Sequence, residues 1–126
     1  MEIGGRMALE VKVRKKNGTP IIALGGRAIG SDVEKFAKKL ESLYKNGSKT
    51  IILDLSEVSF LDSQGLGKIV YYYHIMEKAG RSLVILNANP DPQMFVRRLF
   101  SLTNLDQVLK IVDDINQVWG AEKAFD

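Results

Sequence analysis

The chain contains no cysteine, and it has only one histidine, one tryptophan and three prolines among its 126 residues. Without cysteine there is no disulfide, no thiolate nucleophile and no cysteine-based metal site. The single histidine, His74, has no second histidine or cysteine with which to share a metal ion, so we expect it on a helix surface. No apolar run has the length that crosses a membrane, and the start of the chain lacks the apolar core of a signal peptide. We therefore expect a cytoplasmic protein that does not insert into a membrane.

The rest of the composition is typical of a globular domain, with 45% hydrophobic and 26% charged residues. This length predicts a single domain over residues 1–126, with a frayed end at 1–7 and a C-terminal helix at 113–126. The net charge of +3 includes basic clusters at 12–16 and 35–39. A nucleic-acid surface would be denser in basic residues and interleaved with aromatic ones. We interpret both clusters as solvated faces and expect no nucleic-acid partner.

The first part of the chain predicts a β-hairpin. Residues 8–14 alternate apolar and charged side chains, as a half-buried strand does. Asn17-Gly18 follows, and this pair is favoured in tight hairpin turns because both central positions need a positive φ. Residues 20–24 then return as a second strand, and the glycine-rich residues 25–30 are expected to form a flexible link. The buried side of the first strand would carry Leu9, Val11 and Val13.

After the hairpin, apolar strands alternate with amphipathic helices. Ser31 and Glu34 predict a capping box at the start of the first helix. We expect further strands at 49–55, 82–86 and 108–112, and helices ending near Tyr44, Lys78, Ser101 and the C-terminus. Strand–helix–strand units give a mostly parallel sheet, so the predicted fold class is α/β, a hairpin followed by βα units. The third helix would bury Phe95 or Val96, Leu99 and Leu102, and the last one Ile115, Val118 and Trp119.

The segment 54–67 is the most informative part of the sequence. It follows the apolar run Ile-Ile-Leu at 51–53 and ends in Asp62-Ser63, directly before Gly65, Gly67 and a helical pattern. Aspartate and serine are preferred at helix starts, because their side-chain oxygens accept from unpaired backbone N–H groups. The Ser63 hydroxyl is thus expected at the positive end of a helix, where a phosphate is stabilised. From these local signals alone, a simple capping serine is the commoner explanation.

Enzymatic signatures are missing around this segment. Gly65-Leu-Gly-Lys resembles part of a phosphate-binding P-loop, but Asp62 and Ile69 stand where that motif needs glycine and serine or threonine. The sequence shows no paired general acid and base and no nucleophile beside a histidine. We therefore expect neither an enzyme nor a cofactor. Among the consecutive tyrosines at 71–73, Tyr73 is expected in the core, with Tyr71 or Tyr72 available to a partner.

The pattern Asp54-Leu-Ser-x-Val-x-Phe-Leu-Asp-Ser-x-Gly-Leu-Gly resembles the signature of the STAS domain family of bacterial anti-sigma factor antagonists. The resemblance extends from about Leu9 to Trp119 and implies the same βα architecture. It implies that Ser63 is the serine phosphorylated by an anti-sigma factor kinase. It also implies that Asp62 shapes the turn, while Gly65 and Gly67 give access. Two nearby serines do not align with the phosphorylated serine of the family and are only second-choice phosphate acceptors: Ser56 and Ser59.

The resemblance also implies a docking surface around the acceptor. Its expected members are Asp62, Gln64, Gly65, Leu66 and Gly67, together with Gly26 and Arg27. A second family motif, Gly-Glu-Leu-Asp, is read here as Gly26-Arg-Ala-Ile, so both of its acids are replaced. This replacement leaves open a partner with a different surface, or a member that is not phosphorylated. For Asp54 we favour a structural role.

The function implied is a protein switch. Unphosphorylated, the chain would bind an anti-sigma factor, itself the serine kinase, and so free a sigma factor; a phosphatase would reset it. A phosphate adds about −1.5 to −2 charge at the centre of the contact. Two alternatives remain: a STAS regulatory subunit of a transporter such as a lipid-exporting ABC system, and a small-anion or nucleotide binder at the Ser63 helix start.

Overall fold

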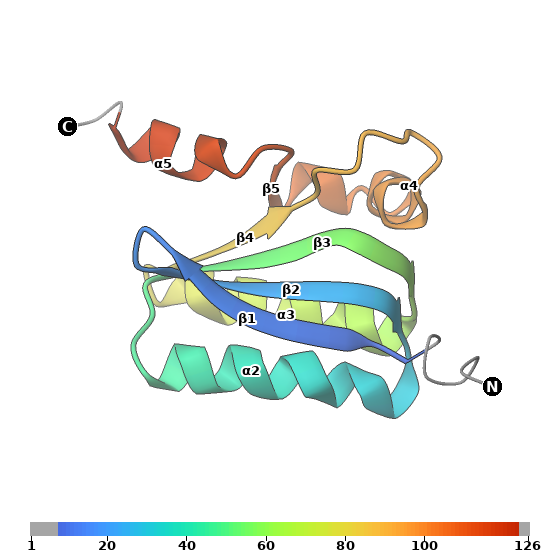
Figure 1. The fold of residues 1–126 in the computed structure, drawn as a ribbon, viewed down its shortest axis with the longest axis horizontal. Helices are drawn as coiled ribbons and strands as arrows, with labels where there is room; N and C mark the ends of the chain where they lie inside the picture. The colour runs from blue at the N-terminus through green and yellow to red at the C-terminus, as the bar shows by residue number, and fades with distance from the viewer. Residues whose placement is uncertain (1–7, 124–126) are drawn as a thin grey trace.

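Five strands form one sheet in the order β1-β2-β3-β4-β5 (Figure 1). The structure, a computed structural model, describes residues 8–123. The strand β1 pairs antiparallel with β2, and the other neighbouring strands pair in parallel, which confirms the predicted α/β class. The predicted frayed end and the last three residues of the predicted C-terminal helix lie outside the described residues. The elements are β1 (Glu10–Lys16), β2 (Thr19–Ala28), η1 (Gly30–Asp32), α2 (Val33–Lys45), β3 (Thr50–Leu61), α3 (Ser63–Lys78), β4 (Ser82–Leu86), α4 (Phe95–Leu102), η2 (Leu105–Gln107), β5 (Lys110–Val112) and α5 (Asn116–Lys123).

The predicted hairpin is confirmed. Asn17 and Gly18 have φ values of 53° and 77°, as a two-residue turn between β1 and β2 requires. The predicted inward position of Val13 is wrong, because this side chain is 46% exposed. β1 is an edge strand with a neighbour on one side only, so its apolar residues are covered less completely.

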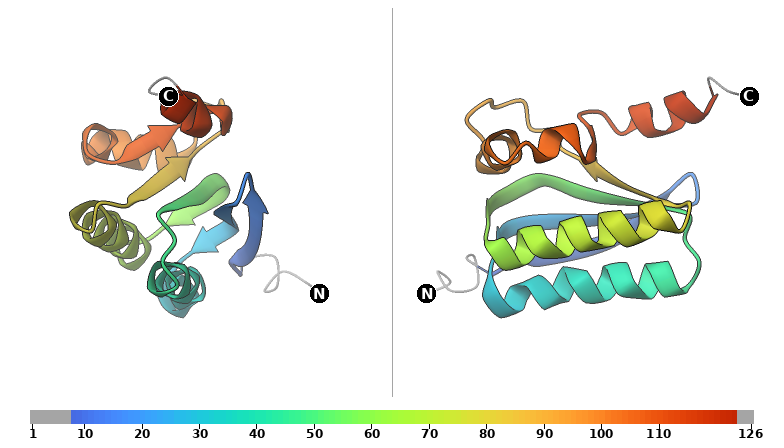
Figure 2. Two further views of the ribbon diagram at one scale, coloured as in Figure 1. Left: turned by 90° about the vertical axis from the view of Figure 1, so that its left-hand side faces the viewer. Right: turned by 180° about the vertical axis from the view of Figure 1, so that it is seen from behind.

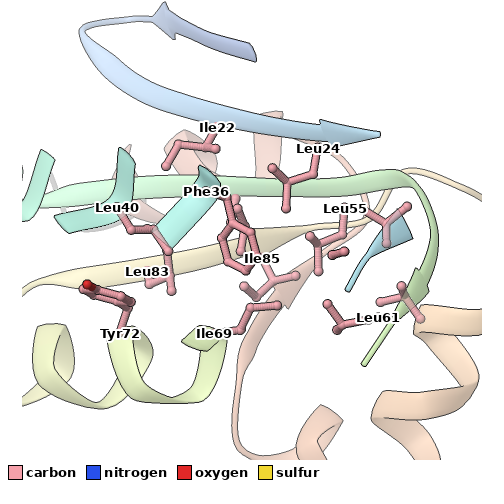
Figure 3. Packing of buried hydrophobic residues seen from close by; sticks show 14 of the residues in the cluster. Ile22, Leu24, Phe36, Leu40, Leu55, Leu61, Ile69, Tyr72, Leu83 and Ile85 are labelled. Carbon is pink, nitrogen blue, oxygen red and sulfur yellow. The ribbon is translucent and has the colours of Figure 1, made fainter. Parts of the chain in front are cut away.

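The helices cover the two faces of the sheet unequally. Helices α2, α3 and α4 lie along one face, and α5 lies against the other (Figure 2). Successive strand residues point to opposite faces, so β2, β3 and β4 each contribute to two cores. The larger core includes Phe36 of α2, Ile69 of α3 and strand residues such as Leu55 and Ile85 (Figure 3). The smaller core contains Ile21, Ile52, Val84, Leu86 and Val118, with Ile115 and Trp119 packed against it as predicted.

β2 and β3 are longer than predicted. Residues 25–28, expected in a flexible link, continue β2 and pair with β3 as far as Ala28 opposite Leu61. The register shifts twice between Ala23 and Arg27, and Gly26 takes a φ of +93°. Glycine tolerates the positive φ at such an irregularity, so these glycines bend a paired strand. β3 therefore runs through the polar residues 56–57 and ends directly before Asp62.

The predicted capping box at Ser31 is wrong. Residues Gly30–Asp32 form a 3₁₀ turn, and α2 begins at Val33 with Asp32 as its N-terminal flanking residue. The Asp32 side chain does not cap the helix; its Oδ2 accepts a hydrogen bond from the backbone N–H of Leu9 at 3.3 Å. The Asp32 carboxylate thus attaches the start of α2 to Leu9, which lies 23 residues earlier in the sequence. Gly47 and Gly80 follow α2 and α3 with positive φ, as expected of helix ends.

Two further predictions of buried residues are wrong. Tyr72 is the buried tyrosine, at 7% exposure, while Tyr73 is half-buried and Tyr71 is 56% exposed. The side of α3 facing the sheet carries Ile69, Tyr72 and Met76, so Tyr72 takes the inward position expected of Tyr73. α4 buries Val96 and Phe100, and its Leu102 is 78% exposed. His74 is exposed, as predicted.

Candidate functional site

Asp62 connects the start of α3 to the end of β2. Its Oδ1 accepts a hydrogen bond from the backbone N–H of Gly65 at 2.9 Å, which caps the helix. Its Oδ2 accepts from the backbone N–H of Gly30 at 2.8 Å, and its own N–H donates to the carbonyl of Ala28 at 3.2 Å. One side chain thus closes the β3–α3 turn and fixes it to the loop that follows β2.

These contacts keep the Asp62 carboxyl ionised. The hydrogen bond from Gly30, followed by that from Gly65, lowers the pKa of Asp62, because both donors stabilise the charged form. A negative charge at the N-terminus of α3 also interacts favourably with the helix dipole. The turn beside Ser63 therefore carries a fixed negative charge at neutral pH.

Ser63 is the first residue of α3, and its side chain is exposed. Among the residues that the structure describes, none forms a hydrogen bond with its hydroxyl. The capping role that commonly explains a serine at this position belongs to Asp62 instead. The Ser63 hydroxyl thus lies at the positive end of a helix, accessible from outside.

The two glycines of the predicted surface have different roles. A Cβ atom on Gly65 would lie 2.6 Å from Leu61 Cδ1 and 3.1 Å from the carbonyl oxygen of Ala28. Glycine at this position therefore lets α3 pack closely against β3, which differs from the expected access role. Around Gly67 a Cβ would meet nothing within 4 Å, and the residue is exposed. Gln64 is exposed, and Leu66 packs half-buried against the larger core.

Arg27 lies at the same end of the sheet, within a cluster that the sequence did not predict. Arg27 is the register partner of Phe60, and its Cζ lies 5.4 Å from the centre of that ring. The ring of Phe60 is in turn 4.6 Å from that of Phe95, the first residue of α4. The ends of β2 and β3 and the starts of α3 and α4 meet at this end of the molecule (Figure 1). The register of β2 against β3 places Arg27 beside Phe60, and the position of α4 beside β3 adds Phe95.

Residues 10–118 match the family described as STAS domain. The chain belongs to the STAS domain family. It is 25% identical over 109 residues to the anti-sigma F factor antagonist of Paenibacillus polymyxa, covering 86% of this chain and 90% of that protein.

Solved structures show the same fold. The STAS domain has a TM-score of 0.75, at 20% identity, with an anti-sigma factor antagonist from Mycobacterium paratuberculosis, covering 90% of this chain and 93% of that one. With the anti-sigma factor antagonist SpoIIAA in its unphosphorylated form the TM-score is 0.69, at 20% identity, covering 91% and 97%. With the Bacillus cell fate determinant SpoIIAA in the phosphorylated form it is 0.65, at 21% identity, covering 89% and 99%.

The second-choice acceptor Ser56 has a structural function in this STAS domain. Asp54 Oδ1 accepts from the backbone N–H of Ser56 at 3.0 Å and from its hydroxyl at 2.6 Å. The Ser56 hydroxyl also accepts from the N–H of Ala88 at 2.8 Å, which attaches the loop after β4 to β3. This is the structural role favoured for Asp54. Ser59 is exposed on β3.

Two surface grooves of the STAS domain are lined by residues other than 62–67. One, of about 930 Å³, is lined by residues of β1, β2 and β3 that include Lys12, Arg14, Asp54 and Glu57. A smaller one, of about 370 Å³, lies between the loop after β4, Arg97 and Asp113. Within residues 8–123 no group of three or more histidine or acidic side chains is placed to hold a metal ion. In the same part of the chain, every helix is too short or too polar to span a lipid bilayer.

Proposed function

We propose that this STAS domain is an anti-sigma factor antagonist whose binding is switched at Ser63. Its relative from Paenibacillus polymyxa is named an anti-sigma F factor antagonist, and SpoIIAA is known in unphosphorylated and phosphorylated forms. The observation that carries the proposal is the division of roles at the start of α3. Asp62 caps the helix, so the exposed hydroxyl of Ser63 is available to a kinase.

In the unphosphorylated state, the anti-sigma factor docks on the end of the sheet around Ser63 and releases its sigma factor. The interface forms around a neutral hydroxyl flanked by Gln64 and Gly67, both exposed. Because the hydroxyl has no structural partner among the described residues, a docking protein engages it without breaking a contact within the fold.

Phosphorylation of Ser63 by the anti-sigma factor itself, acting as a serine kinase, ends this contact. The modification adds about −1.5 to −2 charge beside the carboxylate of Asp62, which is already ionised. The N-terminus of α3 stabilises the phosphate in the free protein, so the fold is retained. The partner surface, shaped for a hydroxyl, must desolvate or repel the new charge, and each ~1.4 kcal/mol of that penalty weakens binding tenfold. A phosphatase restores the binding form.

The test is intact-mass analysis after incubation with ATP and the candidate anti-sigma kinases of the source organism. We expect the parent protein to gain one phosphoryl group and Ser63→Ala to gain none. In binding assays Ser63→Ala should bind the kinase constitutively, and Ser63→Asp should not bind although its circular dichroism is unchanged. If both variants bind the kinase as the parent does, the switch at Ser63 is wrong.

The position of Arg27 supports a second candidate function. A guanidinium stands where the related motif has an acid, so the partner surface differs from that of the family pattern. A regulatory subunit of a transporter, for example of a lipid-exporting ABC system, would have such a different partner. Pull-down with the intact chain separates the two candidates, because one partner is a kinase and the other a transport ATPase.

A further inference from the structure

Helix α4 presents a line of apolar side chains on its outer side. Phe95, Leu99 and Leu102 are spaced four and then three residues apart, which places them on one side of the helix. Phe95 is 36% exposed and Leu102 is 78% exposed, and Leu99 between them is half-buried and packs against the edge of the larger core. Val96 and Phe100, on the other side of α4, are buried in that core. We refer to Phe95, Leu99 and Leu102 as the α4 stripe. Single exposed leucines are common on protein surfaces, but an aligned set on one short helix is less so.

The α4 stripe is continuous with the Ser63 end of the sheet. Its first member, Phe95, stacks on Phe60 with ring centres 4.6 Å apart and an interplanar angle of 31°. Phe60 precedes Ser63 by three residues and has the guanidinium of Arg27 over its ring. The apolar side chains therefore extend from α4 to Phe60, near the end of β3.

The charged side chains of α4 itself are all positive. Within α4 the only charged residues are Arg97 and Arg98, and Arg98 is exposed. The guanidinium of Arg97 donates to the carbonyl of Asn89 within the fold, so Arg98 and, at the Phe60 end, the half-exposed Arg27 are the cations beside the apolar side chains. The complement of such a surface is an apolar segment flanked by carboxylates, because guanidinium groups pair best with carboxylates in a bidentate geometry.

We propose that the α4 stripe is the second half of the docking surface for the anti-sigma factor. The partner places an apolar segment on Phe95, Leu99 and Leu102, and its Asp or Glu side chains face Arg27 and Arg98. This inference rests on the proposed function and assigns different roles in binding to the α4 stripe and to Ser63. The stripe supplies affinity and partner choice, while Ser63 supplies the switch.

The test uses the kinase that phosphorylates Ser63, purified, and measures its Kd for the parent chain and for single variants by isothermal titration calorimetry. Leu102→Glu should weaken binding roughly ten- to a hundredfold, because an exposed leucine that becomes buried in the complex is replaced by a charge. Arg98→Glu should weaken binding and reduce its dependence on salt. The control is Val13→Glu, which introduces the same charge at an exposed apolar residue of β1 and should bind as the parent does.

The outcomes separate this inference from the proposed function. Since Leu102 is 78% exposed, thermal unfolding of Leu102→Glu should match the parent, so lost binding reports on the surface. If Leu102→Glu and Arg98→Glu bind like the parent while Ser63→Asp does not bind, the stripe is not an interface and only the proposed function stands. If no candidate kinase binds the parent, both fail. If sedimentation velocity shows a dimer that Leu102→Glu dissociates, the stripe binds a second copy of this chain, and the proposal is wrong.

Discussion

Replacing Asp62 with alanine should destabilise the fold, whereas replacing Ser63 with alanine should not. The two residues are adjacent and both are good helix-capping types, so this pair tests how the roles are divided at the start of α3. Asp62→Ala removes two hydrogen bonds, one to the N–H of Gly65 and one to the N–H of Gly30. Ser63→Ala removes no hydrogen bond to another described residue.

The expected magnitudes follow from these contacts. Loss of an N-terminal cap typically costs about 1 kcal/mol, and loss of the second charge-assisted bond adds roughly another 1 kcal/mol at a half-exposed site. Asp62→Ala should therefore lower the free energy of unfolding by about 2 kcal/mol. Ser63→Ala should change it by less than ~0.5 kcal/mol, since alanine has the higher helix propensity and the hydroxyl is exposed.

Urea unfolding followed by circular dichroism measures both values, and unchanged m-values would show that the two-state comparison holds. A loss for Ser63→Ala equal to that for Asp62→Ala would contradict this division of roles between Asp62 and Ser63. In that case the serine would be the cap, and its hydroxyl would not be free for a partner or a kinase.

Two further predictions concern the same turn. The hydrogen bonds from Gly30 and Gly65 lower the pKa of Asp62, so its stabilising effect is fully present above the ordinary carboxyl pKa of 3.8 and is lost as the pH falls through the lower pKa of the folded state. The stability difference between the parent and Asp62→Asn should thus shrink below about pH 4, and a difference that grew there in urea titrations would contradict this assignment. Gly65→Ala should destabilise by roughly 1–3 kcal/mol, because its Cβ would overlap Leu61, whereas Gly67→Ala should stabilise by up to about 1 kcal/mol in an open helical position. Thermal unfolding of the two variants measures both, and equal effects would argue against close packing at Gly65.

Local chemistry explains what the sequence predicted well. The positive φ values at Asn17 and Gly18 follow from the residues themselves, so the hairpin turn was predictable. The alternation of apolar strands and amphipathic helices also follows from short-range periodicity, and with it the parallel sheet. The position of Ser63 at the start of a helix follows in the same way.

Contacts between distant segments explain what the sequence did not predict. The polar residues 56–57 interrupt the apolar pattern of β3, but pairing with the bent end of β2 extends the strand to Leu61. The choice between Asp62 and Ser63 as the cap depends on the N–H of Gly30, which is 32 residues away in the sequence. Tyr72 replaces Tyr73 in the core because neighbouring helix residues differ by about 100° in direction, and packing alone fixes that phase. Leu102 fits an inward pattern but is exposed, since periodicity does not indicate what covers a helix face.

Whether the Ser63 hydroxyl is the switch can be measured by a site-resolved phosphorylation assay coupled to binding. The parent chain is incubated with ATP and the cognate anti-sigma kinase, its phosphate is located by peptide mass spectrometry, and the binding of the purified product is measured. The account predicts one phosphate, on Ser63, and a product that no longer binds the kinase. A phosphate on Ser56 or Ser59 instead, or a product phosphorylated on Ser63 that binds as tightly as the unmodified chain, would contradict it.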